Sequence, residues 1–379
     1  MNMQLAALGR WTGAIGTALF VLAGAAQAQA QAPTEPTPND MARFLAGLPV
    51  ADSSPLAESA RQPAWRRHAE AMDAAWGNIE KRQLSNIRTW TAAELTNPSP
   101  VLYYMFSGPD FLYADAFFPS ATTYVMAALE PSGPAPALRR QRGGGESLGY
   151  ALAQLRSSLN SILNYSFFRT REMRTTLGEN TFSGTLPILY IFLARTGKTI
   201  DELSFHDITE DGSLVPPGDG LPKGAASVAK ILFTGSDAKQ RTLYYVRTDL
   251  SNGGWRKSGF KAFSEKFEPG DSLIKSASYL LHSGAFSDIR DYLLSRSKRL
   301  VQDDSGVPLV HLKKEEWTLR PYGRYLGPIA LFPSHYQPKL GELFRREKAP
   351  RIDFGIGYRF RANESNVLVA DKLKVEAAR

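Results

Sequence analysis

The chain of 379 residues contains no cysteine. This absence excludes disulfide bonds, thiolate metal sites, cysteine nucleophiles and thiol redox motifs. The fold must therefore depend on its core, and 43% apolar with 11% aromatic residues is the composition of a globular protein. The length suits one large domain or two ordinary ones.

The sequence also lacks an apolar run that could span a membrane, which takes about 20 residues. The apolar run from Trp11 to Gly24 is shorter and is interrupted by glycines. Arg10 precedes it and the small-residue tripeptide Ala26-Gln27-Ala28 follows, which is the pattern of a cleaved secretory signal peptide. We therefore predict a signal peptide over residues 1–28 and a periplasmic or secreted location.

A proline-containing stretch follows the predicted signal peptide. Pro33, Pro36 and Pro38 lie there among small polar residues, a composition that does not order itself. We predict a flexible leader over residues 29–39 and a single mixed α/β domain over residues 40–379, with a small helical N-terminal part. Because a large periplasmic domain does not need disulfides, the missing cysteines favour a bacterial periplasm over a eukaryotic secretory route.

The basic residues exceed the acidic ones, which gives a formal charge of +8 at pH 7. They are scattered, with short clusters at 139–142, 296–299 and 345–348. A basic surface attracts anionic partners, so the candidate partners are an envelope glycan, an anionic lipid surface or an envelope protein. Nucleic acid is not expected as a partner outside the cytoplasm.

Hydrophobic periodicity predicts both helices and strands, and hence an α/β fold with one sheet flanked by helices. The expected helices cover residues 40–48, 65–87, 120–129, 148–173, 185–194, 272–282 and 286–296. The expected strands cover residues 101–106, 227–233, 242–248 and 352–360, with a strand, a turn and a strand over 300–310. Loops rich in Pro and Gly are expected at 130–145 and 211–224.

Two short motifs of known enzyme families occur in contexts that do not fit them. Gly270-Asp271-Ser272-Leu273 matches the signature of a family of serine esterases and lipases, but it lies late in the chain and no Asp-x-x-His follows. We instead expect Asp271 or Ser272 to cap the helix at 272–282. His206-Asp207 supplies two metal ligands in a family of phosphohydrolases, but the other histidines are isolated, so no metal site is predicted.

The turn after the apolar run 101–106 is the best candidate site. Ligands bind beyond the carboxyl ends of parallel strands. Asp110 and Asp115 are the candidate catalytic residues, as a general acid and base or as anchors for a sugar hydroxyl. The candidate ligand-binding residues here are Ser107, Gly108, Asp110 and Tyr113. The alternative is structural: Gly108 makes the turn and Asp110 caps the next helix.

A second candidate ligand-binding surface combines aromatic and cationic residues near the C-terminus. Arg320, Tyr322 and Arg324 alternate with other side chains between Trp317 and Tyr325. Guanidinium groups and rings could together recognise a carboxylate or a glycan. The alternative is that these residues stabilise a half-buried strand.

Several motifs together resemble a family of uncharacterised exported bacterial proteins. They are Phe-Ser-Gly-Pro-Asp at 106–110, Phe-Phe-Pro at 117–119, Leu-Glu-Pro at 129–131, Ser-Ala-Ser-Tyr-Leu-Leu-His at 276–282 and Gln-Asp-Asp-Ser-Gly at 302–306. The resemblance spans most of the chain after the signal peptide. It implies bacterial export and one integrated domain, and it transfers no functional residue.

These observations favour a non-catalytic periplasmic protein that binds a ligand or partner of the cell envelope. One alternative is a periplasmic hydrolase that acts on a glycan or ester with paired carboxylates. Another is a structural envelope protein with a broad exposed patch. No cofactor and no metal are predicted.

Overall fold

The computed structural model describes residues 35–138, 147–165, 167, 182–218, 220 and 223–373. The predicted signal peptide, most of the leader and part of the loop at 130–145 lie outside these residues. All described residues belong to one compact unit, Pro33–Arg379. None of the helices in these residues combines the length and the apolar composition that a membrane-spanning helix requires.

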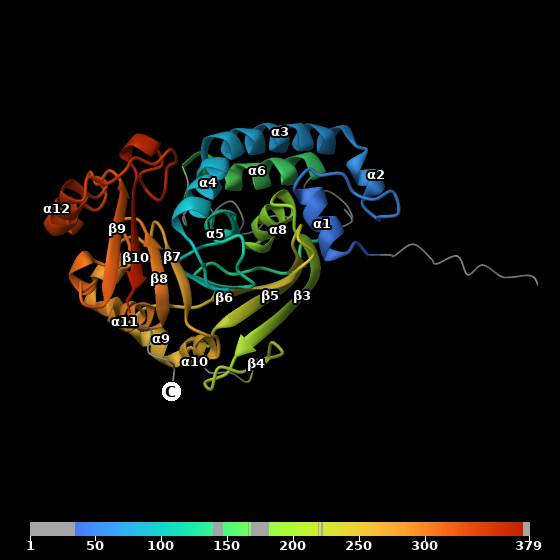
Figure 1. Ribbon diagram of the computed structural model, residues 1–379. Coiled ribbons are helices and arrows are strands. Elements are labelled where there is room, and N and C mark those ends of the chain that lie inside the picture. Colours follow the sequence, from blue (N-terminus) through green and yellow to red (C-terminus); the bar gives the residue numbers. More distant parts are fainter. Residues whose placement is uncertain are drawn as a thin grey trace, which may run out of the picture. The chain divides into compact units, whose positions relative to one another are not determined.

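A ten-stranded mixed sheet forms the centre of the described part (Figure 1). The order across it is β4-β3-β5-β6-β2-β1-β7-β8-β10-β9. The strands are β1 (Val101–Met105), β2 (Thr123–Ala128), β3 (Thr199–Ile208), β4 (Leu214–Val215), β5 (Ser227–Thr234), β6 (Gln240–Arg247), β7 (Gly270–Ile274), β8 (Ser297–Gln302), β9 (Trp317–Gly323) and β10 (Asn366–Lys372).

Five neighbouring strands, β6, β2, β1, β7 and β8, are parallel. Numbered in chain order, they lie across the sheet as 3-2-1-4-5, the order of a doubly wound α/β fold. The chain moves outward from β1 to β2 and β6, then returns to the other side of β1 to form β7 and β8. The strand order therefore reverses between β1 and β7, where ligands bind in sheets of this kind.

Antiparallel strands extend the parallel core on both sides. On one side, β5 pairs with both β6 and β3, and β3 pairs with β4. On the other side, β10 lies between β8 and β9 and is antiparallel to both. The last strand in the chain thus occupies an interior position in the sheet.

Helices cover both faces of the sheet (Figure 1). Above it in this view lie α1 (Pro38–Leu45), α3 (Pro63–Ile79), α4 (Ser85–Glu94), α5 (Phe111–Phe117), α6 (Leu148–Tyr165) and α8 (Leu186–Arg195). Below it lie α9 (Asn252–Lys257), α10 (Phe260–Glu265) and α11 (Ser287–Arg296). Each face has its own core: in β1, Leu102 and Tyr104 contribute to one, and Tyr103 and Met105 to the other. This two-sided burial explains why β1 is apolar throughout.

Much of the predicted architecture is confirmed, including the fold class. The helix expected at 185–194 is α8, which ends before Gly197 in a left-handed conformation (φ +76°). The strands expected at 227–233 and 242–248 form the β5–β6 hairpin. The first helix begins at Pro38, inside the stretch expected as a leader, because Thr37 caps it with a capping box.

The helix predicted at 120–129 is wrong, since this segment contains strand β2. The strand is central and its last five residues are fully buried, so it shows no alternation of apolar and polar residues. A short apolar run of this kind cannot be told from a buried helix by periodicity. Its Thr-Tyr-Val composition favours a strand.

The helix predicted at 272–282, with Asp271 or Ser272 as its cap, is also wrong. Both residues lie in β7, a fully buried strand. Asp271 Oδ2 accepts a hydrogen bond from the Ser99 amide (2.8 Å), and Ser272 Oγ lies 2.7 Å from Ser297 Oγ. Ser99 and Ser297 thus provide hydrogen-bond partners for Asp271 and Ser272 inside the sheet. In the sequence, the same two polar residues resemble a helix cap.

Two predictions for the C-terminal region need correction. The alternating segment at 352–360 is no strand; it forms one isolated bridge, between Ile356 and Arg359. The second strand expected within 300–310 is a short 3-10 turn at Leu309–His311, although the first is β8. The C-terminal strands of the sheet are instead β9 and β10.

Candidate functional site

A cavity of about 240 Å³ opens where the strand order reverses. The carboxyl ends of four parallel strands contribute to its lining: Ser107 follows β1, Glu130 follows β2, Asp249 follows β6 and Lys275 follows β7. We call this cavity the crevice. Residues far apart in the sequence meet here because parallel strands all end at the same edge of the sheet.

The turn after β1 positions the first wall of the crevice. Phe106 (φ +61°) and Gly108 (φ +55°) both adopt left-handed backbone conformations, which glycine tolerates and phenylalanine adopts at a cost. Asp110 then caps α5, accepting a hydrogen bond from the Tyr113 amide (3.2 Å). The structural interpretation of this turn is therefore confirmed, and the same residues border the crevice.

A buried ion pair lies at the base of the crevice. Lys275 Nζ is 2.8 Å from Asp110 Oδ2, and both side chains are only 1% exposed. The Tyr104 hydroxyl donates to the same oxygen (2.8 Å), and the ammonium lies 4.2 Å from the centre of the Tyr113 ring. Burial raises the pKa of Asp110, while Lys275 and the tyrosine hydroxyl lower it. The pair joins the ends of β1 and β7 across the reversal point.

The loop after β7 forms the opposite wall and is strained. Ser276, Ser278 and Tyr279 all have positive φ, between 49° and 54°. The Tyr358 hydroxyl fastens this loop, because it donates to the Ser276 carbonyl (3.0 Å) and accepts from the Ser278 amide (3.1 Å). Tyr358 itself lines the crevice. Such a cluster of uncommon backbone conformations is typical of ligand sites.

Two adjacent carboxyl groups lie behind this loop. Asp303 Oδ2 accepts from the Ser276 amide (3.0 Å), and Asp304 Oδ2 accepts from the Tyr279 hydroxyl (2.7 Å). Burial, together with the charge of Asp304, raises the pKa of Asp303 to about 7. Burial also raises the pKa of Asp304. Both carboxyl groups thus hold the loop that forms this wall of the crevice.

Two hydrogen-bonding groups of the crevice have no partner among the described residues. The Glu130 carboxylate makes no hydrogen bond or ion pair with any described residue, although Glu130 is only 7% exposed. The Ser276 hydroxyl is buried and likewise has no partner among the described side chains and backbone. Buried polar groups are normally satisfied, so the Ser276 hydroxyl is a candidate to bind a ligand. The Glu130 carboxylate is a second candidate because Glu130 lines the crevice.

Comparison with protein-family models and with curated proteins found no match. Of the residues predicted at the β1 turn, Ser107, Gly108 and Asp110 line the crevice. Tyr113 contacts Lys275 but is not part of the lining. Asp115 lies elsewhere, where its carboxylate pairs with Lys198 (2.8 Å).

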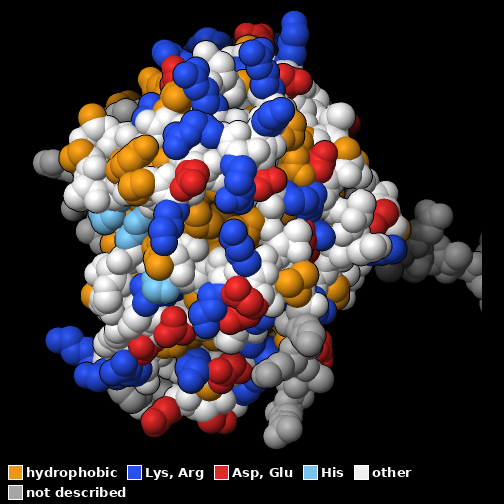
Figure 2. Space-filling view, turned by 60° about the vertical axis from the view of Figure 1, so that its left-hand side comes forward, with side chains coloured by type: hydrophobic (Ala, Val, Ile, Leu, Met, Phe, Trp, Pro, Cys, Tyr) orange, Lys and Arg blue, Asp and Glu red, His pale blue; other side chains and the backbone are white. Residues whose placement is uncertain are grey.

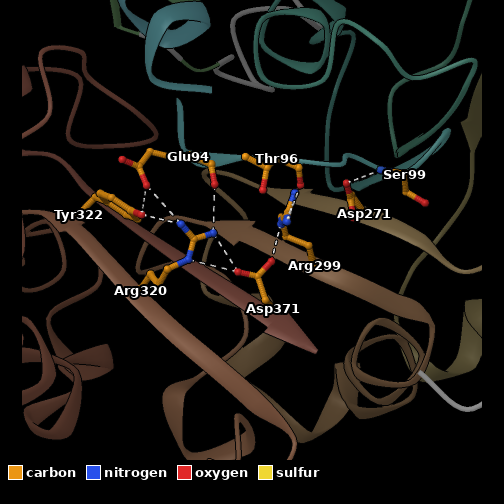
Figure 3. Close-up of polar contacts among 8 residues, drawn as sticks. All are labelled: Glu94, Thr96, Ser99, Asp271, Arg299, Arg320, Tyr322 and Asp371. Carbon is orange, nitrogen blue, oxygen red and sulfur yellow. Dashed lines mark hydrogen bonds and ion pairs between the residues drawn. The ribbon is translucent and has the colours of Figure 1, made fainter. Parts of the chain in front are cut away.

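The other predicted surface does not line the crevice, since none of Arg320, Tyr322 and Arg324 belongs to its lining. Figure 3 shows the polar network in which Arg320 and Tyr322 lie. Arg320, on β9, donates to Glu94 Oε2 (3.2 Å) and to Asp371 Oδ2 (2.9 Å). The Tyr322 hydroxyl donates to Glu94, and Arg299 also pairs with Asp371 (2.5 Å). This network ties the end of α4 to β8, β9 and β10.

Arg324 does not join this network through its side chain. It is exposed in the segment after β9, where its amide donates to the Ser365 carbonyl (2.7 Å). The structure therefore does not gather Arg320, Tyr322 and Arg324 around one ligand-sized cavity with the β1 turn.

We expect Arg320→Ala to lower the free energy of unfolding by about 1–2 kcal/mol, because it removes charge-assisted hydrogen bonds at a partly exposed site. It should leave ligand binding in the crevice unchanged. Urea denaturation and calorimetric titration of the same sample measure the two effects. A large loss of ligand affinity with normal stability would instead assign Arg320 to the binding site.

Sequence reasoning missed Glu130, Asp249 and Lys275. Each follows directly, or within two residues, the end of a parallel strand. In the sequence, the pattern that indicates such a site residue is an acidic or basic residue just after an apolar run. At β2 and β7 this signal is hidden, because the sequence predicts helices at 120–129 and 272–282.

Proposed function

We propose that the protein binds a small molecule in the crevice. The main support for this proposal is that residues at the ends of four parallel strands line one cavity, which lies where the strand order reverses. A hydrolase that uses Asp110 with Asp115 is less well supported, because only Asp110 borders the cavity and the two carboxylates pair with different lysines.

We further propose that the ligand contains a ribose. In doubly wound folds, an acidic residue about 20 positions beyond the first turn binds ribose hydroxyls. Glu130 has this position relative to Gly108, follows the second parallel strand, and has a carboxylate without a partner among the described residues. A vicinal diol would supply two donors to that carboxylate.

The charges of the crevice argue against a phosphate group on this ligand. Among the described residues, Asp110, Glu130 and Asp249 line it together with one basic residue, Lys275, whose charge Asp110 balances. The β1 turn also holds one glycine where the dinucleotide-binding motif has three. An acidic pocket favours a neutral or cationic nucleoside. S-adenosylmethionine combines a ribose with positive charge and lacks phosphate, so it is a suitable first probe.

Calorimetric titration of the purified protein with S-adenosylmethionine, adenosine, NAD and ATP tests this proposal. We expect binding of the first two and much weaker binding of the phosphate-bearing compounds. Glu130→Gln should weaken nucleoside binding about tenfold to a hundredfold, since hydrogen bonds to charged groups contribute about 1.5–3 kcal/mol. Glu265→Gln, an exposed change on α10, is the matched control. Binding of none of the four compounds would refute the ribose assignment.

We also propose that the protein is exported to the bacterial periplasm. The charged N-terminus, apolar run and small-residue site at residues 1–28 support this location. Sequencing of the mature N-terminus from fractionated cells tests it. An uncleaved chain in the cytoplasm would contradict export without affecting the ligand proposal.

A further inference from the structure

An uncharged, exposed segment lies beside the crevice. Residues 326–336 contain no Lys, Arg, Asp or Glu. Leu326, Leu331 and Tyr336 of this segment are 40%, 75% and 53% exposed. Val310 is 72% exposed and is next to Leu309, whose amide donates to the Gln337 side chain at the end of the segment (2.9 Å). We call residues 326–336 with Val310 the apolar rim.

The apolar rim is attached to the crevice wall. The Phe332 ring lies 5.7 Å from the ring of Tyr358, which lines the crevice, and 5.1 Å from that of Tyr279. Arg359 donates to the carbonyls of Gly327 and Pro328 (3.1 and 3.2 Å). A surface that contacts the apolar rim is therefore close to the crevice.

A basic helix lies on the other side of the apolar rim. Tyr336 stacks on Tyr325, which packs against Phe344 of α12 (Pro338–Arg346). The apolar face of α12 is buried, and Lys339, Arg345 and Arg346 are exposed.

The charges near the apolar rim are mostly positive. Between Arg324 and Arg351 the chain has six basic and two acidic residues. Figure 2 shows this side of the molecule, where Lys and Arg side chains outnumber acidic ones and hydrophobic side chains lie beside histidines. The apolar rim thus adjoins a cationic surface.

We propose that the apolar rim and α12 dock this protein on an anionic lipid bilayer. Exposed leucines enter the interface between headgroups and acyl chains, tyrosines favour the same depth, and nearby cations attract anionic headgroups. Docking in this way places the crevice next to the membrane surface. The inference does not depend on which ligand the crevice binds.

Sedimentation of the mature protein with lipid vesicles tests this inference. We expect binding to vesicles that contain phosphatidylglycerol, weak binding to pure phosphatidylcholine, and a marked loss in high salt. Leu331→Ser should lower the partition coefficient about tenfold. Lys339→Gln with Arg345→Gln should lower it about thirtyfold for anionic vesicles, since each basic residue near the surface contributes about 1 kcal/mol.

Matched controls separate docking from general effects. Leu373→Ser replaces a similarly exposed leucine (54%) after β10, and Lys239→Gln with Lys257→Gln removes two exposed charges elsewhere. Both should leave vesicle binding unchanged, and crevice ligand binding should persist in every variant. Absence of binding to anionic vesicles, or an equal loss in the control variants, would overturn the proposal. So would light scattering that showed a dimer which Leu331→Ser converts to a monomer.

Discussion

Replacing Lys275 by methionine is expected to lower the free energy of unfolding by about 3–5 kcal/mol at neutral pH. The change leaves the Asp110 carboxylate, which is 1% exposed, without its cationic partner. The Tyr104 hydroxyl and the Tyr113 amide still donate to it, but they do not neutralise its charge. Urea denaturation monitored by tryptophan fluorescence measures the loss.

A double-mutant cycle shows whether this loss comes from the ion pair. Asp110→Asn with Lys275→Met should be more stable than Lys275→Met alone, because the amide carries no charge that needs a partner. The stability deficit of Lys275→Met should also shrink in acid, where Asp110 takes up a proton. A loss below about 1 kcal/mol for the single variant at neutral pH would show that the pair is not ionised in the folded protein.

The buried carboxyl of Asp303 should make the folded protein less stable as the pH rises from about 4 to about 7. Its pKa rises from 3.8 in the unfolded reference to about 7 on folding, because burial and Asp304 disfavour the charged form. Across this range the unfolded chain has lost the proton that the folded protein retains. The contribution amounts to at most about 4 kcal/mol and is constant above pH 7.

Asp303→Asn provides the comparison that isolates this effect. The variant has lost hydrogen bonds to Ser276 and Ser305, so its absolute stability is not informative. The difference in the free energy of unfolding between the parent and the variant should nevertheless change with pH over this range. Asp304→Asn should shift the transition to lower pH, since it removes a neighbouring charge. Parallel pH profiles for the parent and Asp303→Asn would refute the raised pKa.

The sequence predicts elements well where a local signal is unambiguous. The apolar run of β1 ends in a glycine turn, and the β5–β6 hairpin has alternating side chains around a turn. β2 and β7 lack such a signal. Helices bury both faces of these strands, so their side chains do not alternate between apolar and polar. In β7, the polar residues Asp271 and Ser272 form hydrogen bonds with partners that are distant in the sequence.

The candidate site could be predicted only in part for the same reason. Ser107, Gly108 and Asp110 were found because they follow a recognisable strand. Glu130 and Lys275 follow β2 and β7, whose strand character depends on tertiary packing. These residues meet in the crevice because of the order of the strands in the sheet. A local sequence pattern does not reveal that order. The tight grouping of Asp110 with Lys275 likewise depends on the pairing of β1 with β7.

The interior position of β10 has a consequence for how this chain folds. β9 has no partner in the sheet other than β10, because β10 separates it from β8. Residues 366–372 must therefore be synthesised before β9 can join the sheet. A chain delivered from its N-terminus can order the strands around β1 earlier. Strand β9 therefore stays without a sheet partner until residues 366–372 have been synthesised.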